Sequence, residues 1–252
     1  MTDLPASHEE LLAKVPLREG ARIEGAPIAY GHDGTELEGY VAHDAAAQEP
    51  RPGILVIHDW LGVGVNVELR AQMLARLGYV ALAADIYGVG GAPTHEEAPA
   101  LAGTFYGDLP LMRARVQAAY ETLVELPQVD ESRIAVIGYC FGGSAAIEFA
   151  RTGADLRGVV SFHGRLLTHD PSDAANIRAK LLILTGGSDP AVTDDDIRAF
   201  QDELRTVPEL DWQTVIYSGA PHAFTVPGDR FRPVADARSW QAMQAFFDEV
   251  LA

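Results

Sequence analysis

The sequence predicts an α/β protein with a mostly parallel, doubly wound sheet and helices on both of its faces. Short, nearly continuous apolar runs alternate with amphipathic helical patterns along the chain. Such runs, bounded by turn residues, are typical of strands that are buried on both faces of a parallel sheet. No repeat or long Gly/Ser/Pro linker divides the 252 residues, of which 48% are hydrophobic. We therefore expect a single domain over residues 1–252, with residues 1–20 as an N-terminal extension.

The predicted strands follow one another at regular intervals. An Asp33-Gly34 pair between two alternating segments predicts a β-hairpin near the start of the chain. Buried strands are expected within residues 53–59, 79–87, 133–140, 156–164 and 179–189. Residues 211–220 alternate more strongly between apolar and polar, which favours a strand near the edge of the sheet.

Four helices are predicted from apolar residues that recur on one helical face. The first helix ends at Gly78, and the second begins after Asp108 and Pro110. The four apolar stripes are Leu69, Met73, Leu74 and Leu77; Met112, Val116, Ala119, Tyr120 and Leu123; Ile197, Phe200 and Leu204; and Trp240, Met243, Phe247 and Val250. Residues 88–107 are too few for a large lid, and we expect them at the rim of a pocket.

Charge and composition exclude several classes of function. A net charge of -17 would repel phosphate backbones and anionic membranes, so we expect neither nucleic acid nor a membrane as a partner. The sequence has no apolar run long enough to span a bilayer and no secretory signal, which favours a cytoplasmic protein. We expect a monomer or a small homo-oligomer. The single cysteine excludes an internal disulfide and metal sites built from several thiolates, and we expect no cofactor and no metal.

That cysteine, Cys140, lies where a predicted strand runs into a predicted helix. The surrounding Gly138-Tyr139-Cys140-Phe141-Gly142 has the form Gly-x-nucleophile-x-Gly, in which glycines allow strand and helix backbones to approach closely. The N-terminus of the following helix favours a thiolate, and would equally favour an oxyanion. The alternative is a small buried side chain without chemistry, which is the usual role of a free cysteine.

A nucleophile of this type needs a base, and the base needs an acidic residue to orient it. Asp189 follows a predicted buried strand, and His222 follows the last predicted strand, so both occur in the chain order that the fold requires. Asp189 could instead cap a turn before Pro190. Weaker candidates for the acid are the helix-capping residues Asp194, Asp195 and Asp196.

Several motifs in this order resemble the dienelactone hydrolase family of α/β-hydrolases. They are "VIHDWLG", "GYVALAADIYG", "GYCFGG", "GGSDPAV" and "GAPHAF", and the resemblance extends from about residue 54 to the C-terminus. It implies an α/β-hydrolase fold. It also implies that Cys140 is the nucleophile, that His222 acts as base and acid, and that Asp189 orients His222.

The resemblance also implies roles for the "HDWLG" stretch. Asp59 occupies the place of an acidic residue that controls thiol ionisation, and it is one methylene shorter than the usual Glu. The backbone N–H groups of Trp60 and Phe141 match the oxyanion hole. A turn cap is the alternative role for Asp59, whereas the preceding His58 is expected to point away and to be structural.

The predicted pocket residues are Tyr87, Val89, His163, Phe224 and Val226. His163 could instead serve packing alone. Family members that process dienelactone bind its carboxylate with two arginines, and Val89 and Val226 occupy those two positions here. An aliphatic side chain cannot bind a carboxylate, so we expect a different substrate. Arg165, Arg230 or Arg232 could supply a positive charge from another direction.

These residues predict a hydrolase of small carboxylic esters or lactones that forms an acyl-enzyme intermediate on Cys140. Two alternatives stay open. The same residues could act on a thioester or a peptide bond, or the chain could be a non-catalytic protein that binds or senses a ligand.

Overall fold

The computed structural model describes residues 5–252. Met1–Leu4, the start of the predicted extension, therefore lie outside the described residues. The chain divides into two compact units, Met1–Ile134 and Ala135–Ala252. The single domain over residues 1–252 stays a prediction.

The strands of the first unit are β1 (Ile23–His32), β2 (Thr35–Asp44), β3 (Arg51–Ile57) and β4 (Val80–Ala84), in the order β1-β2-β4-β3. The predicted hairpin joins β1 to β2, because Asp33 and Gly34 both adopt positive φ angles, 47° and 75°. β3 and β4 pair in parallel, and Ile54, Leu55 and Val56 are fully buried, as their continuous apolar run predicts.

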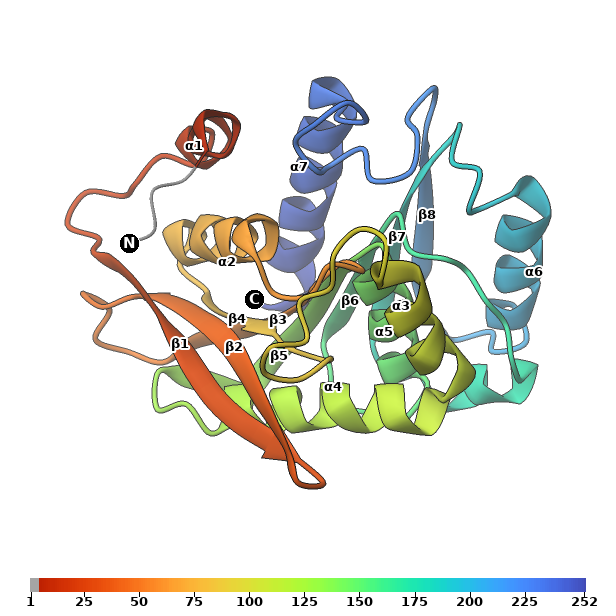
Figure 1. Ribbon diagram of the computed structural model, residues 1–252, viewed down its shortest axis with the longest axis horizontal. Helices are drawn as coiled ribbons and strands as arrows, with labels where there is room; N and C mark the ends of the chain where they lie inside the picture. The colour runs from red at the N-terminus through yellow and green to blue at the C-terminus, as the bar shows by residue number, and fades with distance from the viewer. Residues whose placement is uncertain (1–4) are drawn as a thin grey trace. The chain divides into compact units, whose positions relative to one another are not determined.

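Helices cover both faces of the strands in the first unit. α2 (Val65–Leu77) lies on one face, and α4 (Leu109–Val124) lies on the other (Figure 1). The predicted boundaries are confirmed. Gly78 ends α2 in a left-handed conformation with φ 103°, and the Asp108 side chain accepts the Leu111 N–H at the start of α4.

The first unit also has two helices that the sequence patterns did not predict. α1 (Ala6–Ala13) lies within the N-terminal extension. The extension is attached to α2, because the Arg76 side chain of α2 donates hydrogen bonds to the carbonyl oxygens of Leu12 and Val15. α3 (Ala98–Gly107) lies within the stretch expected only as a pocket rim. Its buried stripe is Ala98, Ala102 and Phe105, and two of these are too small to produce a strong apolar pattern.

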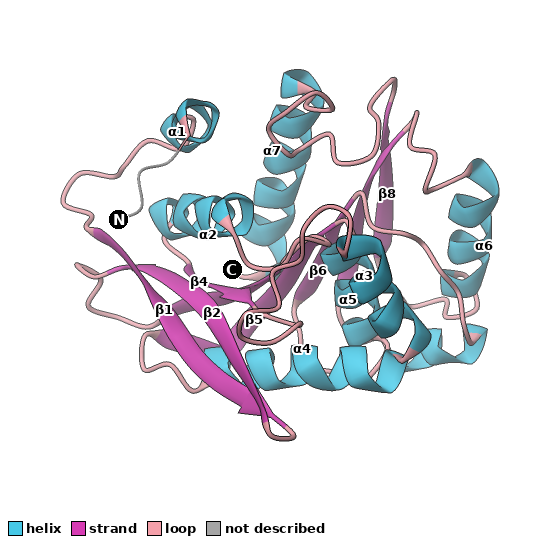
Figure 2. Ribbon diagram, viewed as in Figure 1, coloured by secondary structure: helices cyan, strands magenta, loops and turns pink. Residues whose placement is uncertain are grey.

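The second unit contains the later part of β5 (Val129–Tyr139), then β6 (Gly158–Phe162), β7 (Lys180–Gly186) and β8 (Trp212–Tyr217). These four strands are parallel in the order β5-β6-β7-β8, so β8 lies at an edge, as predicted (Figure 2). The helical segments are α5 (Phe141–Ala150), the 3₁₀ helix η1 (Pro171–Asn176), α6 (Asp194–Leu204) and α7 (Pro233–Val250).

In this unit too, helices pack on both faces of the sheet. A Cβ on Gly158 of β6 would lie 2.6 Å from the Phe246 ring of α7. Ser161 is three residues further along β6 and so faces the opposite side, where its hydroxyl lies close to Gly143 of α5. Because parallel pairing predominates and helices cover both faces, the predicted mostly parallel, doubly wound arrangement is confirmed.

Across residues 5–252, every helix is too short or too polar to cross a membrane.

Candidate active site

Cys140 occupies a strained turn between β5 and α5. Its φ of 54° and ψ of -112° are unusual for a non-glycine residue. The glycine two residues before it is required by close packing, since a Cβ on Gly138 would lie 1.9 Å from the Gly142 carbonyl oxygen. The thiol therefore stands at the end of a parallel strand and at the N-terminus of a helix, as the Gly-x-Cys-x-Gly pattern predicts.

Asp189 lies in the turn after β7, and its side chain is fully buried. Its Oδ1 accepts the Ala191 N–H at 2.8 Å, which leaves Oδ2 free to face His222. The end of β7 passes close to the loop that carries His222, because a Cβ on Gly186 would lie 2.3 Å from the Ala220 carbonyl oxygen. Glycine at that position allows the two loops to approach.

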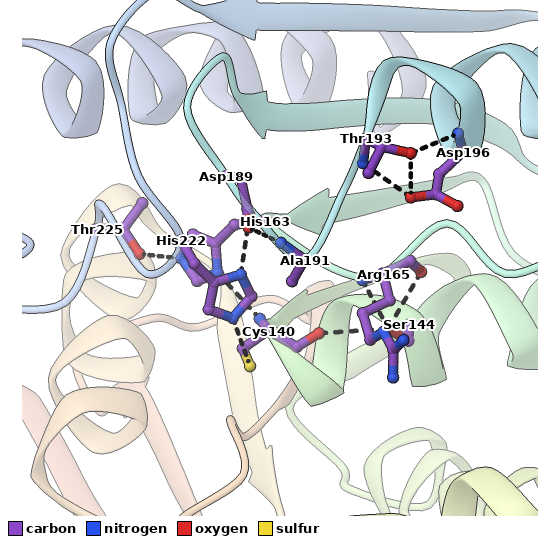
Figure 3. Close-up of polar contacts among 10 residues, drawn as sticks. All are labelled: Cys140, Ser144, His163, Arg165, Asp189, Ala191, Thr193, Asp196, His222 and Thr225. Atoms are coloured by element: carbon purple, nitrogen blue, oxygen red, sulfur yellow. Dashed lines mark hydrogen bonds and ion pairs between the residues drawn. The ribbon is translucent and has the colours of Figure 1, made fainter.

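His222 connects the other two side chains (Figure 3). Its Nδ1 lies 2.8 Å from Oδ2 of Asp189, and its Nε2 lies 3.0 Å from Sγ of Cys140. A carboxylate accepts only, so Nδ1–H donates to Asp189 and Nε2 faces the sulfur. The structure thus brings together the three residues that the sequence analysis selected, in the geometry of a nucleophile, a base and an orienting acid.

The electrostatics of His222 follow from these two contacts. Burial disfavours its charged imidazolium form, but hydrogen bonds with Asp189 and Cys140, and the negative charges of both, outweigh burial and raise its pKa to about 10. The positive charge of an imidazolium on His222 therefore lies 3.0 Å from the Cys140 sulfur.

The raised pKa of His222 predicts a pH-dependent stability. Between pH 6.5 and about pH 10 the folded protein holds a proton on His222 that the unfolded chain has released. The stabilisation from this proton is therefore complete below pH 6.5 and is lost as the pH rises through about 10. Urea unfolding should show that the free-energy advantage of the wild type over His222→Gln shrinks across this range. A constant difference would contradict the assignment.

Asp194, Asp195 and Asp196, the weaker candidates for the acid, lie at the start of α6, where they have a structural role. The Thr193 side chain accepts the Asp196 N–H, and the Asp196 carboxylate accepts the Thr193 N–H, so the pair forms a capping box at the start of α6. Thr193, and not one of the three aspartates, is the N-cap residue. Asp194 and Asp195 lie in the first turn of the same helix.

One set of contacts around the site was not predictable from the sequence. His163, fully buried at the end of β6, accepts the Cys140 N–H at Nδ1 and lies 2.8 Å from Oγ1 of Thr225 at Nε2. Thr225 was not selected at all. Its position three residues after His222 was the only available signal, because a threonine carries no distinctive chemistry.

In the first unit, the Asp59 carboxylate accepts the Leu61 N–H at 2.9 Å, which is the contact expected of a turn cap. Its control of the thiol, and the oxyanion role of Trp60, stay predictions. His58 is fully buried. It contacts the Asp59 carbonyl oxygen through Nδ1 and accepts the Ile86 N–H at Nε2, which agrees with the predicted structural role.

The predicted pocket residues differ in exposure. Tyr87 is nearly buried and donates its hydroxyl to the Trp60 carbonyl, whereas Val89 is 60% exposed and lines a cavity of about 190 Å³. Phe224 is fully buried against the His163 ring, and Val226 is half-buried. The three candidate arginines, Arg165, Arg230 and Arg232, have exposed positions. The guanidinium of Arg232 also donates to the carbonyl oxygens of Asp229 and Phe231.

Over residues 5–252, no group of three or more His, Cys, Asp or Glu side chains is arranged to hold a metal ion. A reaction without a cofactor stays a prediction.

Comparison with known proteins finds solved structures and a natural sequence that are similar to this chain over most of its length. The structure named m3DLH is 38% identical with a TM-score of 0.88, and the match covers 91% of this chain and 99% of that one. The dienelactone hydrolase-like promiscuous phosphotriesterase P91, from metagenomic libraries, is 36% identical with a TM-score of 0.88, over 92% of this chain and 100% of that one. A Yersinia pestis protein described as "Putative carboxymethylenebutenolidase" is 26% identical over 230 residues, 86% of this chain and 85% of its own length.

These similarities confirm the predicted α/β-hydrolase fold without a large lid. The sequence model of the dienelactone hydrolase family matches residues 37–251. The chain is therefore a hydrolase that belongs to the dienelactone hydrolase family.

Proposed function

We propose that this protein hydrolyses small carboxylic esters or lactones through an acyl-enzyme intermediate on Cys140. One observation carries the proposal. The His222 ring lies between the Cys140 sulfur, at 3.0 Å, and the Asp189 carboxylate, at 2.8 Å. Cys140 itself lies on a strand-to-helix turn of the type that carries nucleophiles in this fold.

In the first half-reaction the Cys140 thiolate attacks the carbonyl carbon and forms an S–C bond. The negative charge moves to the carbonyl oxygen, which the Phe141 N–H, at the first position of α5, and the Trp60 N–H would stabilise. Collapse of this intermediate breaks the C–O bond. The departing alkoxide takes the proton from Nε2 of His222 and leaves as an alcohol, or stays attached if the substrate is a lactone.

In the second half-reaction neutral His222 takes a proton from water. The resulting hydroxide attacks the acyl carbon, the S–C bond breaks, and the acid is released while the thiolate and the imidazolium form again. Asp189 accepts the Nδ1–H throughout and favours the imidazolium. Substrate, water and residues of this chain supply every atom and proton, so the proposal needs no cofactor.

The substrate follows from the side chains that replace the family's two arginines. Val89 and Val226 offer no partner for a carboxylate, and the exposed Arg165 and Arg230 lie on the protein surface. We therefore propose esters or lactones that carry no carboxylate at those positions. The net charge of -17 supports a small molecule as the partner, in preference to nucleic acid or a membrane. A cytoplasmic location is proposed as well. A monomer or small homo-oligomer is proposed for the assembly.

The intermediate itself tests this proposal. Wild-type protein mixed with phenyl acetate and quenched in acid should gain the mass of one acetyl group, and peptide mapping should locate it on Cys140. The Cys140→Ala variant should gain none. Turnover of the ester without any adduct, together with undiminished turnover by Cys140→Ala, would contradict the proposal. Thioester and amide substrates with the same acyl group then show which type of bond the protein cleaves fastest.

A second candidate is hydrolysis of phosphotriesters, which the similarity to the promiscuous phosphotriesterase favours at 36% identity. The same thiolate would attack phosphorus and expel one alkoxide or phenoxide, and water would then release the phosphodiester. Paraoxon turnover that disappears in Cys140→Ala would support this activity, and a kcat/KM for paraoxon above that for phenyl acetate would make it the principal one. Equal paraoxon turnover in both proteins would exclude it as an activity of Cys140.

A further inference from the structure

His163 and Thr225 form a buried polar chain beneath the candidate active site, and the proposed reaction does not use either of them. His163 is 0% exposed and Thr225 is 1% exposed. The ring of His163 makes a polar contact at each nitrogen, one toward the loop of Cys140 and the other toward the loop of His222. A buried histidine with both nitrogens engaged is more than a packing element.

The first contact fixes the peptide that precedes the sulfur. The Cys140 N–H donates to the Phe162 carbonyl oxygen at 2.9 Å, and it also lies 3.2 Å from Nδ1 of His163. Two acceptors hold this N–H and so define the plane of the Tyr139–Cys140 peptide. That plane limits the directions open to the Cys140 side chain. The φ of 54° costs free energy, and these two contacts help to offset it.

The second contact fixes the loop that carries the base. Because Nδ1 accepts the Cys140 N–H, Nε2 must carry the proton, and it donates to Oγ1 of Thr225 at 2.8 Å. Thr225 lies three residues after His222, and between them Ala223 adopts a positive φ of 58°. The neutral His163 ring also meets the His222 ring edge-on, with centroids 5.4 Å apart and planes at 63°.

His163 is itself in a strained conformation, with φ 43°, and its own N–H donates to the Leu184 carbonyl oxygen. Three of the non-glycine residues with positive φ, Cys140, His163 and Ala223, thus lie next to one another in this site. Such strain persists only where the surrounding contacts hold it in place.

We propose that His163 is a positioning residue. By bridging the two loops that carry Cys140 and His222, it holds the Cys140 sulfur and the His222 ring in a fixed relative position. The inference rests on the proposed function, since it assigns His163 an effect on the thiolate–imidazolium pair. It predicts that loss of the bridge slows the reaction of the thiol itself and lowers kcat, while KM changes little, because His163 touches no substrate.

Four variants separate the two ends of the bridge. His163→Phe keeps an aromatic ring but removes both polar contacts. His163→Asn can still accept the Cys140 N–H through Oδ1, and asparagine tolerates positive φ. Thr225→Val removes only the hydroxyl, and Thr225→Ser retains it. Each is measured by kcat and KM for phenyl acetate, by the rate of Cys140 alkylation with iodoacetamide at pH 7, and by its melting temperature.

His163→Phe should lower both kcat and the alkylation rate about tenfold, the effect of about 1.4 kcal/mol, with KM within about twofold. Thr225→Val should lower kcat and the alkylation rate about threefold, and Thr225→Ser should match the wild type in both. The values for His163→Asn should lie between those of the wild type and of His163→Phe. Adding Thr225→Val to His163→Phe should cause no further loss, since the two residues act as one unit.

Rates within twofold of wild type in a folded His163→Phe would overturn the proposal, and so would a rise in KM with unchanged alkylation. If His163→Phe does not fold, equal rates for Thr225→Val and Thr225→Ser would overturn it. The alkylation rate reports on the thiol without any ester. Equal phenyl acetate turnover in wild type and Cys140→Ala would therefore refute the proposed function, while the alkylation series would still decide the role of His163.

Discussion

Replacement of Cys140 by alanine should lower kcat/KM for short acyl esters by roughly 10³-fold or more, the scale seen when a nucleophile is removed from such a triad. The reason is that the S–C bond of the intermediate can no longer form, while the oxyanion donors and the binding surface stay in place. Initial rates on phenyl acetate, corrected for buffer hydrolysis, measure this effect.

The control for that experiment is Cys140→Ser, which keeps the shape of the side chain. A serine hydroxyl does not ionise at neutral pH and cannot form a charged pair with His222, so we expect a large loss of activity in a variant that still folds. If Cys140→Ala keeps more than about one tenth of the wild-type kcat/KM while folded, Cys140 is not the nucleophile.

Replacement of Asp189 by asparagine should lower kcat roughly 10²–10⁴-fold. Oδ1 of residue 189 accepts the Ala191 N–H, so asparagine would keep its oxygen there and turn its amide NH₂ toward His222. Nδ1 of His222 would then become an acceptor, which moves the ring proton to Nε2 and leaves no lone pair for the proton of water. The pH dependence of kcat should change together with its magnitude, since the raised pKa of His222 depends on the Asp189 carboxylate.

A matched control is Asp196→Asn, because both substitutions remove one carboxylate: Asp189 lies in the turn after β7, and Asp196 lies in the first turn of α6. Asp196 only completes the capping box with Thr193, so we expect a wild-type kcat and a stability loss of at most about 1 kcal/mol. Similar kcat values for Asp189→Asn and Asp196→Asn would contradict the assignment of Asp189 as the orienting acid.

Much of the fold was predictable because its signals are local. The continuous apolar runs of β3 and β7, the Asp33-Gly34 turn, and the ends of α2 and α4 at Gly78 and Asp108 each depend on a few neighbouring residues. The helix α3 was missed because alanines form part of its buried face. Alanine is found both inside and outside proteins, so its spacing carries little information.

The sequence by itself determined that Cys140 stands on a strand-to-helix turn and that an acid and a histidine follow in the required order. The glycine pattern around the cysteine is a steric requirement of that turn, and the order follows from the succession of strands. Only the tertiary structure decided which oxygen of Asp189 faces His222, and that the His222 ring reaches the sulfur.

The tertiary structure also decided the role of His163. Its two partners, Cys140 and Thr225, are 23 and 62 residues away along the chain, and the contacts exist because the ends of β5 and β6 lie side by side and the loop after β8 folds back onto them. Hydrogen bonds of this kind depend on distances and ring orientation between loops. No local pattern of residues encodes those quantities, whereas strands, turns and helix ends are encoded by their neighbours.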